Sequence, residues 1–321
     1  MGSAEPMSAS TLSEQLVKYL TDVHAMEVQA LAQMRAAPKL AGDEDLARAY
    51  DAHRIETEQH EALVRGRLEA HGATPSRVED LLGAVSGKGF VLFARSQPDT
   101  PGKLATHAFS YEHMELAAYD LLARVAERVG DQETADVARR IREEENAMAI
   151  RLDGFWDRTV DASLDGKDPR EALDDYLADA HALEAQGIEL LKRAPSELAG
   201  VADNHLAESQ RHTELIERRL QDRGGAPSRL KDAALRLGAI NWSGFFAAQP
   251  DTPAKLAMFG YAFEHLEIGA YEQLTRVARR AGDGETALVA DQILPDERAA
   301  AEMLYGSFDA ALDASLHATL T

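Results

Sequence analysis

The chain has 321 residues and no cysteine, and its 34 lysine and arginine residues stand against 55 aspartate and glutamate residues, for a net charge of -21. The lack of cysteine excludes disulfides, iron–sulfur clusters, Cys-ligated zinc and thiol nucleophiles, so any metal must be bound by oxygen and imidazole. The acidic surface argues against nucleic acid and anionic membranes as partners. No apolar run approaches the ~20 residues of a membrane span, and we expect a cytoplasmic protein.

The chain contains two copies of one sequence unit. Residues 97–104 read QPDTPGKL and residues 249–256 read QPDTPAKL, at an offset of 152. Upstream the offset becomes 157, as from Glu27 to Glu184, so the first repeat carries five extra residues in its first interhelical connection. Such periodicity indicates a repeated structural unit. The predicted domains are residues 11–160 and 169–319, joined by a polar linker.

Each repeat is predicted to form four long helices, because alanine, leucine, glutamate and arginine dominate and apolar residues recur at spacings of three and four. In the first repeat these helices run from a capping box of Thr11 and Glu14 to about Pro38, over 44–71, from Thr100 to Gly130, and from Asp131 to the linker. The long connection contains an apolar piece, 90–93, expected to be a short crossover helix. Two short connections and one long one predict an all-α fold of two tandem ferritin-like four-helix bundles, with a long crossover between helices two and three.

Each predicted helix carries one glutamate in the middle of its apolar stripe, the side that a bundle hides from water. These glutamates are Glu27, Glu56, Glu112 and Glu145 in the first repeat and Glu184, Glu208, Glu264 and Glu297 in the second. Burying an ionised carboxylate without a partner costs several kcal/mol, and clustering several adds repulsion. No lysine or arginine occupies the stripe positions, so we expect bound metal ions to neutralise them.

Other side chains extend the predicted ligand set. His60 and His212 lie on the helix-two stripe, and Glu115 and Glu267 lie on the adjoining flank of helix three. Five glutamates and one histidine per repeat match the charge of two divalent or trivalent ions, and an oxygen-rich set favours manganese or iron over zinc or copper. The predicted metal ligands are Glu27, Glu56, His60, Glu112, Glu115 and Glu145, with Glu184, Glu208, His212, Glu264, Glu267 and Glu297.

Neighbouring polar residues allow two interpretations each. His53 lies one turn before Glu56 and is either a ligand or a donor to a ligand. His113 points about 100° away from the glutamate beside it, which favours a packing role. Tyr119 and Tyr271 either donate to a ligand carboxylate or fill the core, and the core is favoured.

Two motifs carry a resemblance to a known family. Residues 53–60 read HRIETEQH and residues 112–119 read EHMELAAY, with copies at 205–212 and 264–271. Each repeat resembles the bacterial stress-associated ferritin-like proteins of the YciE and YciF type, whose helices two and three carry H-x-x-E-T-x-x-H and E-H-x-E-x-x-A-Y. The resemblance spans nearly the whole chain as two fused copies. It implies a ferritin-like bundle with a dinuclear metal centre and a role in stress responses, but no particular reaction.

The motifs depart from ordinary di-iron bundles, which use Glu-x-x-His in helices two and four. The departing positions are Thr57 and Ser209 in place of glutamate, Met148 and Ala300 in place of histidine, and Ala149 and Ala301 where the family often has aspartate. The site is therefore short of ligands on one side, which means either an open position for an oxidant or a weakened site that holds one metal. In the second repeat we expect a bend at Pro295 to displace Glu297.

Three functions follow from this pattern. The first is redox chemistry at a dinuclear iron or manganese site in each repeat, which oxidises Fe(II) or consumes peroxide with O2 or H2O2 as partner and with protein residues as ligands only. The second is a non-catalytic, metal-stabilised structural or binding protein with degenerate sites, whose fusion makes an intrachain pseudo-dimer able to form a homo-oligomer. The third, mineral storage, requires a cage that nothing in the sequence indicates. None of the three involves nucleic acid or a membrane.

Overall fold

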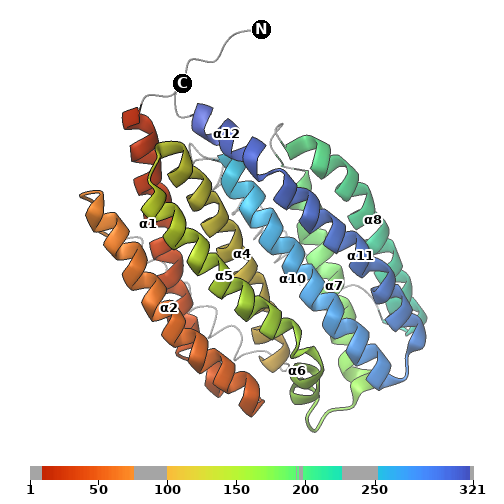
Figure 1. Ribbon diagram of the computed structural model, residues 1–321. Coiled ribbons are helices and arrows are strands. Elements are labelled where there is room, and N and C mark those ends of the chain that lie inside the picture. The colour runs from red at the N-terminus through yellow and green to blue at the C-terminus, as the bar shows by residue number, and fades with distance from the viewer. Residues whose placement is uncertain (1–8, 76–99, 193, 195–197, 226–251, 319–321) are drawn as a thin grey trace.

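The computed structural model describes residues 9–75, 100–192, 194, 198–225 and 252–318. Every regular element in these ranges is a helix, which confirms the all-α fold class. Figure 1 shows the long helices of both repeats lying side by side with their axes roughly aligned. No helix in the described ranges is long and apolar enough to cross a membrane.

The first repeat forms one four-helix bundle. Its elements are α1 (Ala9–Met34), the 3-10 helix η1 (Ala37–Lys39), α2 (Glu44–Ala70), α4 (Thr100–Val129) and α5 (Gln132–Asp153). Helix α1 packs against α2 and α4, and α5 packs against the same two helices, which closes the bundle. Helix α1 begins at Ala9, so Thr11 lies inside it and the expected capping box there is wrong. The expected crossover helix at 90–93 lies outside the described residues.

The second repeat copies this arrangement. Its helices are α7 (Pro169–Leu191), α8 (Ala199–Asp222), α10 (Thr252–Ala281) and α11 (Gly284–Gly306), with the same four packing pairs. The turn between the third and fourth helices is also shared. Gly130 and Gly282 take positive φ there, and Asp131 and Asp283 each accept a hydrogen bond from a backbone N–H of the helix that follows. This tight turn makes consecutive helices antiparallel.

The fourth helix of each repeat is shorter than predicted. Helix α5 ends at Asp153, and after Gly154 the chain turns into α6 (Trp156–Ser163) instead of running on to the linker. Helix α11 is likewise followed by α12 (Phe308–Ala318). The break allows α6 to pack across α4 and α10, where Trp156 lies against Phe109 with ring centroids 5.2 Å apart. Burial of the indole in this contact favours the turn over a straight helix.

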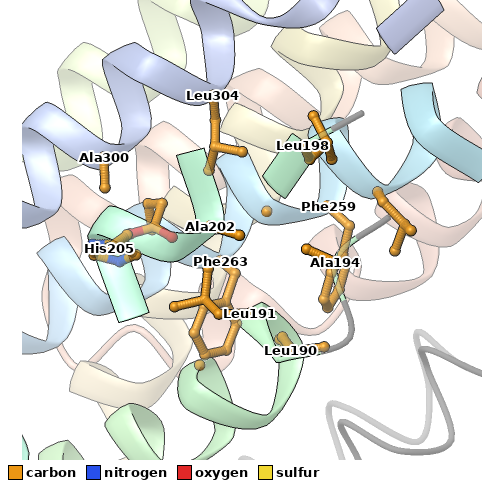
Figure 2. Close-up of a pocket in the computed structure, with 14 residues that line it drawn as sticks. Leu190, Leu191, Ala194, Leu198, Ala202, His205, Phe259, Phe263, Ala300 and Leu304 are labelled. Carbon is orange, nitrogen blue, oxygen red and sulfur yellow. Dashed lines mark ion pairs between the residues drawn. The ribbon is translucent and has the colours of Figure 1, made fainter. Parts of the chain in front are cut away.

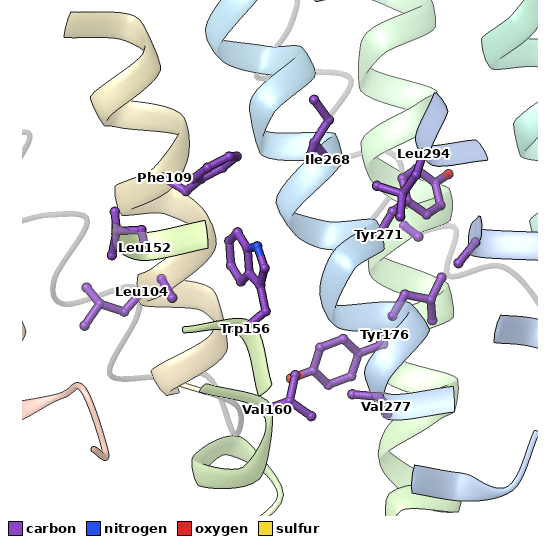
Figure 3. Close-up of a cluster of buried hydrophobic side chains, with 14 of the residues drawn as sticks. Leu104, Phe109, Leu152, Trp156, Val160, Tyr176, Ile268, Tyr271, Val277 and Leu294 are labelled. Carbon is purple, nitrogen blue, oxygen red and sulfur yellow. The ribbon is translucent and has the colours of Figure 1, made fainter. Parts of the chain in front are cut away.

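The two bundles pack against each other through buried apolar side chains, and each of the two hydrophobic clusters contains residues of both repeats. Helices α4 and α10 pack against each other, and Figure 3 shows Phe109 and Trp156 facing α10 across this contact. The approach is close: a Cβ on Gly269 would lie 3.1 Å from side-chain atoms of both Thr106 and Trp156. Gln273 of α10 also donates to the Gly102 carbonyl of α4 at 2.8 Å. The repeats therefore form an intrachain pseudo-dimer with a packed interface.

Candidate metal centre

The buried face of α2 differs by one residue from the predicted stripe. It carries Ala49, His53, Thr57, His60 and Val64, at spacings of four, four, three and four. The side chain of Glu56 is 40% exposed instead of central in the core. Ala49 and His60 lie on both stripes, but the other interior positions move by one residue, from Ala52, Glu56 and Leu63 to His53, Thr57 and Val64.

The structure brings five ionisable side chains together inside the first bundle. They come from all four helices and are at most 1% exposed: Glu27 from α1, His53 and His60 from α2, Glu112 from α4 and Glu145 from α5. Possible ligand atoms of Glu27, His60 and Glu145 lie within 4.8 Å of one another, and so do those of His53, Glu112 and Glu145. The two triads share Glu145.

Glu145 lies between the two histidines. Its Oε2 is 3.2 Å from Nε2 of His53, and its Oε1 is 2.7 Å from Nδ1 of His60. Nε2 of His53 is also 3.2 Å from Oε2 of Glu112, while Nδ1 of His60 is 3.9 Å from Oε1 of Glu27. Each oxygen of one central carboxylate therefore faces a different half of the cluster.

Carboxylates outside the cluster hold the far nitrogens of both histidines. Glu56 contacts Nδ1 of His53 at 3.1 Å, and Glu144 contacts Nε2 of His60 at 2.7 Å. These contacts fix the rings so that the opposite nitrogen of each points into the cluster. Of the two interpretations of His53, the structure favours the ligand position inside the cluster, whereas Glu56, predicted as a ligand, lies outside the cluster and supports the His53 ring.

A tyrosine of each bundle, for which a core role was favoured, also supports a cluster residue from outside the cluster. The hydroxyl of Tyr119 donates to Oε1 of Glu27, and that of Tyr271 donates to Oε1 of Glu184 at 2.5 Å. Both tyrosines are buried and also pack against apolar side chains. The favoured core-only interpretation was therefore incomplete, because each hydroxyl orients a cluster carboxylate.

The second bundle repeats the cluster with close to the same distances. Oε1 of Glu297 is 2.8 Å from Nδ1 of His212, and its Oε2 is 3.5 Å from Nε2 of His205. His205 also lies 3.0 Å from Glu264 and His212 lies 3.3 Å from Glu184. Helix α11 continues through Pro295, and Glu297 is fully buried. The expected displacement of Glu297 by the proline is wrong.

The third-helix flank differs slightly between the bundles. Glu115 and Glu267 are both 1% exposed, as predicted for an adjoining carboxylate. A ligand atom of Glu267 lies within 4.8 Å of those of His205, Glu264 and Glu297, which extends that group to four members. The partly exposed glutamate of helix two has the same place in both bundles. Like Glu56 beside His53, Glu208 is 39% exposed and lies 3.3 Å from Nδ1 of His205.

Many polar atoms in the clusters make no hydrogen bond within the described part of the chain. They include both oxygens of Glu112, Glu145 and Glu297, Oε2 of Glu27 and Glu184, and Nδ1 of His60 and His212. Oε1 of Glu145 and Oε1 of Glu297 lie 2.7 Å and 2.8 Å from Nδ1 of His60 and of His212, but without the geometry of a hydrogen bond. Unpaired buried acceptors are costly, and carboxylate oxygens that converge with imidazole nitrogens are suitable ligands for a cation. The residues present therefore fit bound metal.

Protonation is a second way to neutralise the clusters. Burial, reinforced by Glu145, raises the pKa of Glu27 to about 8, and burial raises that of Glu112 to about 7. Burial opposes charge on His60, but Glu145 and Glu27 outweigh it and raise its pKa to about 9. Burial would likewise raise the pKa of Glu145, yet the two histidines hold it well below its ordinary value. Without metal, the histidines balance part of the negative charge.

His113 and His265 lie outside both clusters, as predicted for His113. Their rings stack at the contact between the bundles with centroids 3.5 Å apart, and each Nδ1 donates to a backbone carbonyl of its own helix. Burial lowers the pKa of His113 to about 4, so the stacked rings are neutral at pH 7. Their role is packing between the repeats.

Comparison with known proteins agrees with the internal repeat. The sequence model of the family described as "Domain of unknown function (DUF892)" matches residues 11–165 and again residues 168–316. Protein YciF of Escherichia coli (strain K12) is 24% identical over 168 residues, which cover 50% of this chain and 99% of YciF. No solved structure matches the chain.

Proposed function

The chain belongs to the DUF892 family, of which it carries two tandem copies, and from this premise we propose that each bundle holds a dinuclear iron or manganese centre that reacts with a small oxidant. The observation that carries the proposal is the place of Glu145 and Glu297. Each presents one carboxylate oxygen to each of two histidines from α2 or α8. A carboxylate in that position is suited to bridge two ions. We propose residues 11–160 and 169–319 as the two functional units.

The protein ligands divide into two sets within each bundle. In the first repeat, Glu112 and His53 would hold one ion and Glu27 and His60 the other, with Glu145 common to both. Glu115 is buried on the same helix as Glu112 and would supply another carboxylate. Helix four has Met148 where di-iron bundles place a histidine, so the described side chains leave coordination positions for small molecules.

The chemistry that such ions supply is one-electron transfer from each of two neighbouring ions. Reduction of one H2O2 to two H2O takes two electrons and two protons, which matches a pair of ions in number. The protein's own residues position the ligands: Tyr119 holds Glu27, and Glu56 and Glu144 hold the histidines. Burial raises the pKa values of Glu27 and Glu112 in the metal-free protein, so bound ions would displace protons from these carboxylates.

A second candidate function, a metal-stabilised structural protein, is favoured by one observation. The pKa values of His60 and His212 are raised to about 9 and about 10, so these histidines are charged at neutral pH and offset part of the buried negative charge without redox-active ions. The two candidates differ in their response to oxidant, because only the first predicts a change in the bound metal when O2 or H2O2 is added.

The test is elemental analysis of protein purified without added metal, followed by anaerobic loading with Fe(II) or Mn(II) and addition of O2 or H2O2 under an absorbance probe. Glu145→Gln and Glu297→Gln should each remove about half of the bound metal. Glu143→Gln is the matched control, since Glu143 lies on the same helix but is exposed. Undiminished metal in either cluster variant would contradict the ligand assignment. Bound metal whose absorbance does not change on addition of O2 or H2O2 would favour the structural function.

We also propose a cytoplasmic location and a role in stress protection. Both can be tested in the source organism by cell fractionation and by survival of a deletion strain under peroxide.

A further inference from the structure

The second bundle contains an apolar cavity that reaches its cluster. The cavity has a volume of about 70 Å³ and lies among α7, α8, α10 and α11. His205 and Glu264 form its inner end, and the rest of its lining is aliphatic or aromatic. Figure 2 shows His205 at one end and Leu190, Ala194 and Phe259 toward the other. Leu190 and Phe259 are partly exposed, so the cavity runs from near the surface to the buried histidine.

In the described part of the first bundle, larger side chains occupy the equivalent space. The repeat offsets pair four small lining residues of the second bundle with larger ones in the first: Gly187 with Ala30, Ala202 with Tyr50, Gly260 with Ala108, and Ala300 with Met148. Tyr50 is fully buried and Met148 is 1% exposed. Both belong to one packed cluster with Leu104 and Leu152, the counterparts of Leu256 and Leu304 in the cavity wall.

The four smaller residues border the cavity from four helices, α7, α8, α10 and α11. Leu304 packs against Gly260 and Phe263 packs against Gly187, since a Cβ on these glycines would lie 3.3 Å and 3.1 Å from those side chains, and both side chains line the cavity. The difference in side-chain volume is largest at Ala202 of α8 and Ala300 of the neighbouring helix α11, where repeat 1 has Tyr50 and Met148.

We propose that this cavity binds a small non-polar molecule beside the metal centre of repeat 2, and that repeat 1 has no such site. Its volume is several times the roughly 10–15 Å³ that one water needs, and apolar walls offer few partners to water, so cavities of this kind stay dry and admit apolar guests. Dioxygen has the required size and polarity. Hydrogen peroxide carries two O–H donors that the aliphatic walls cannot satisfy. The link to dioxygen as oxidant rests on the proposed function, whereas the binding site does not.

Xenon binding tests the site in metal-free full-length protein, by crystals under xenon pressure or by 129Xe NMR. The parent should take up xenon between Ala202 and Leu304. The double variant Ala202→Tyr/Ala300→Met, which installs the residues of repeat 1, should lose it, and Ala300→Met alone should weaken it. The reverse change, Tyr50→Ala/Met148→Ala, should create a xenon site in repeat 1. Circular dichroism and thermal melting establish that each variant is folded.

Dioxygen itself can be followed through its paramagnetism. Leu304 and Leu152 occupy equivalent positions, so methyl relaxation under oxygen pressure should rise at Leu304 and change little at Leu152. Absence of xenon from the parent cavity, or equal relaxation at the two leucines, would overturn the proposal. Because both measurements use protein without metal, a failure of the proposed redox function would leave their outcome unchanged.

Discussion

The two repeats agree at the cluster and differ in the packing behind it. His53 lies 3.2 Å from Glu112 with Tyr50 and Met148 filling the space beyond, and His205 lies 3.0 Å from Glu264 with a cavity there instead. The arrangement of carboxylates and imidazoles therefore does not depend on the apolar side chains around it. What fixes the cluster is the helix framework and the polar contacts from outside, which both repeats retain.

The largest expected difference between the repeats is in the response to changes of side-chain volume. Met148→Ala should lower the free energy of unfolding by about 2–5 kcal/mol and Tyr50→Ala by about 3–5 kcal/mol, because each opens a void in a packed core. Ala300→Met should cost less than about 1 kcal/mol, since the thioether enters existing space. Urea denaturation of the metal-free proteins gives both values. Equal losses from Met148→Ala and Ala300→Met would show that the bundles are packed alike.

Alkaline pH should weaken both bundles when metal is removed. A folded-state pKa raised above its unfolded value stabilises the fold at low pH, and that contribution is lost as pH rises through the folded value. The pKa of His60 is raised to about 9, that of His212 to about 10 and that of Glu27 to about 8, so the stability of the metal-free protein should fall as pH rises from about 5 to about 10.

Melting temperatures measured across this pH range, with chelator and with Mn(II), check the pH prediction. Metal-bound protein should lose less stability, because the ion replaces the protons as the neutralising charge. If the protein in chelator were most stable near pH 10, the prediction that protonated His60, His212 and Glu27 stabilise the metal-free fold would be wrong.

The tyrosine hydroxyls should matter equally in the two repeats. Tyr119→Phe and Tyr271→Phe each remove one buried donor to a cluster carboxylate, at a cost of about 1–3 kcal/mol, and should weaken metal binding in their own bundle. Metal titration of each single variant measures the second effect. Tyr261→Phe is the control, since Tyr261 lies at the contact between the bundles and away from both clusters. Loss of metal from the bundle that was not mutated would contradict the independence of the sites.

The smallest predicted effect concerns the matched turns. Asp131 caps α5 and pairs with Arg67, and Asp283 caps α11 and pairs with Arg219. Asp131→Ala and Asp283→Ala should each cost about 1–2 kcal/mol at neutral pH. Hydrogen bonds from Thr134 and Thr286, together with the neighbouring arginines, hold the pKa of Asp131 and Asp283 below the ordinary value, so the penalty should begin to shrink as pH falls below about 4 and continue to shrink through the lowered pKa. Thermal melts at pH 7 and pH 3 measure it, and a penalty of the same size at both pH values would exclude the electrostatic cause.

Much of the fold could be predicted because helix signals are local and the repeat doubles them. The start of α4 at Thr100, the turn at Gly130 and the cap at Asp131 all appear where the sequence places them. The break before Trp156 was missed, since it depends on packing against the other repeat, which no local pattern records.

The site was harder to predict at the level of single residues. On α2, a stripe through Glu56 and a stripe through His53 differ by one position, and both contain apolar residues at acceptable spacing. Only the packing of α2 against α1 and α5 selects the second. The sequence does contain evidence of the cavity, because Tyr50 and Met148 of repeat 1 correspond to Ala202 and Ala300 of repeat 2. A comparison of side-chain volumes between the aligned repeats, and not only of their charges, would have found it.

The most direct test of the dinuclear proposal is a crystal structure of Mn(II)- or Fe(II)-loaded protein with anomalous scattering recorded at the absorption edge of the metal. We predict two anomalous peaks inside each bundle, one on either side of Glu145 and of Glu297, with His53 and His60 or His205 and His212 at opposite ends. Peaks confined to surface carboxylates, or a loaded protein with no interior peak, would contradict it.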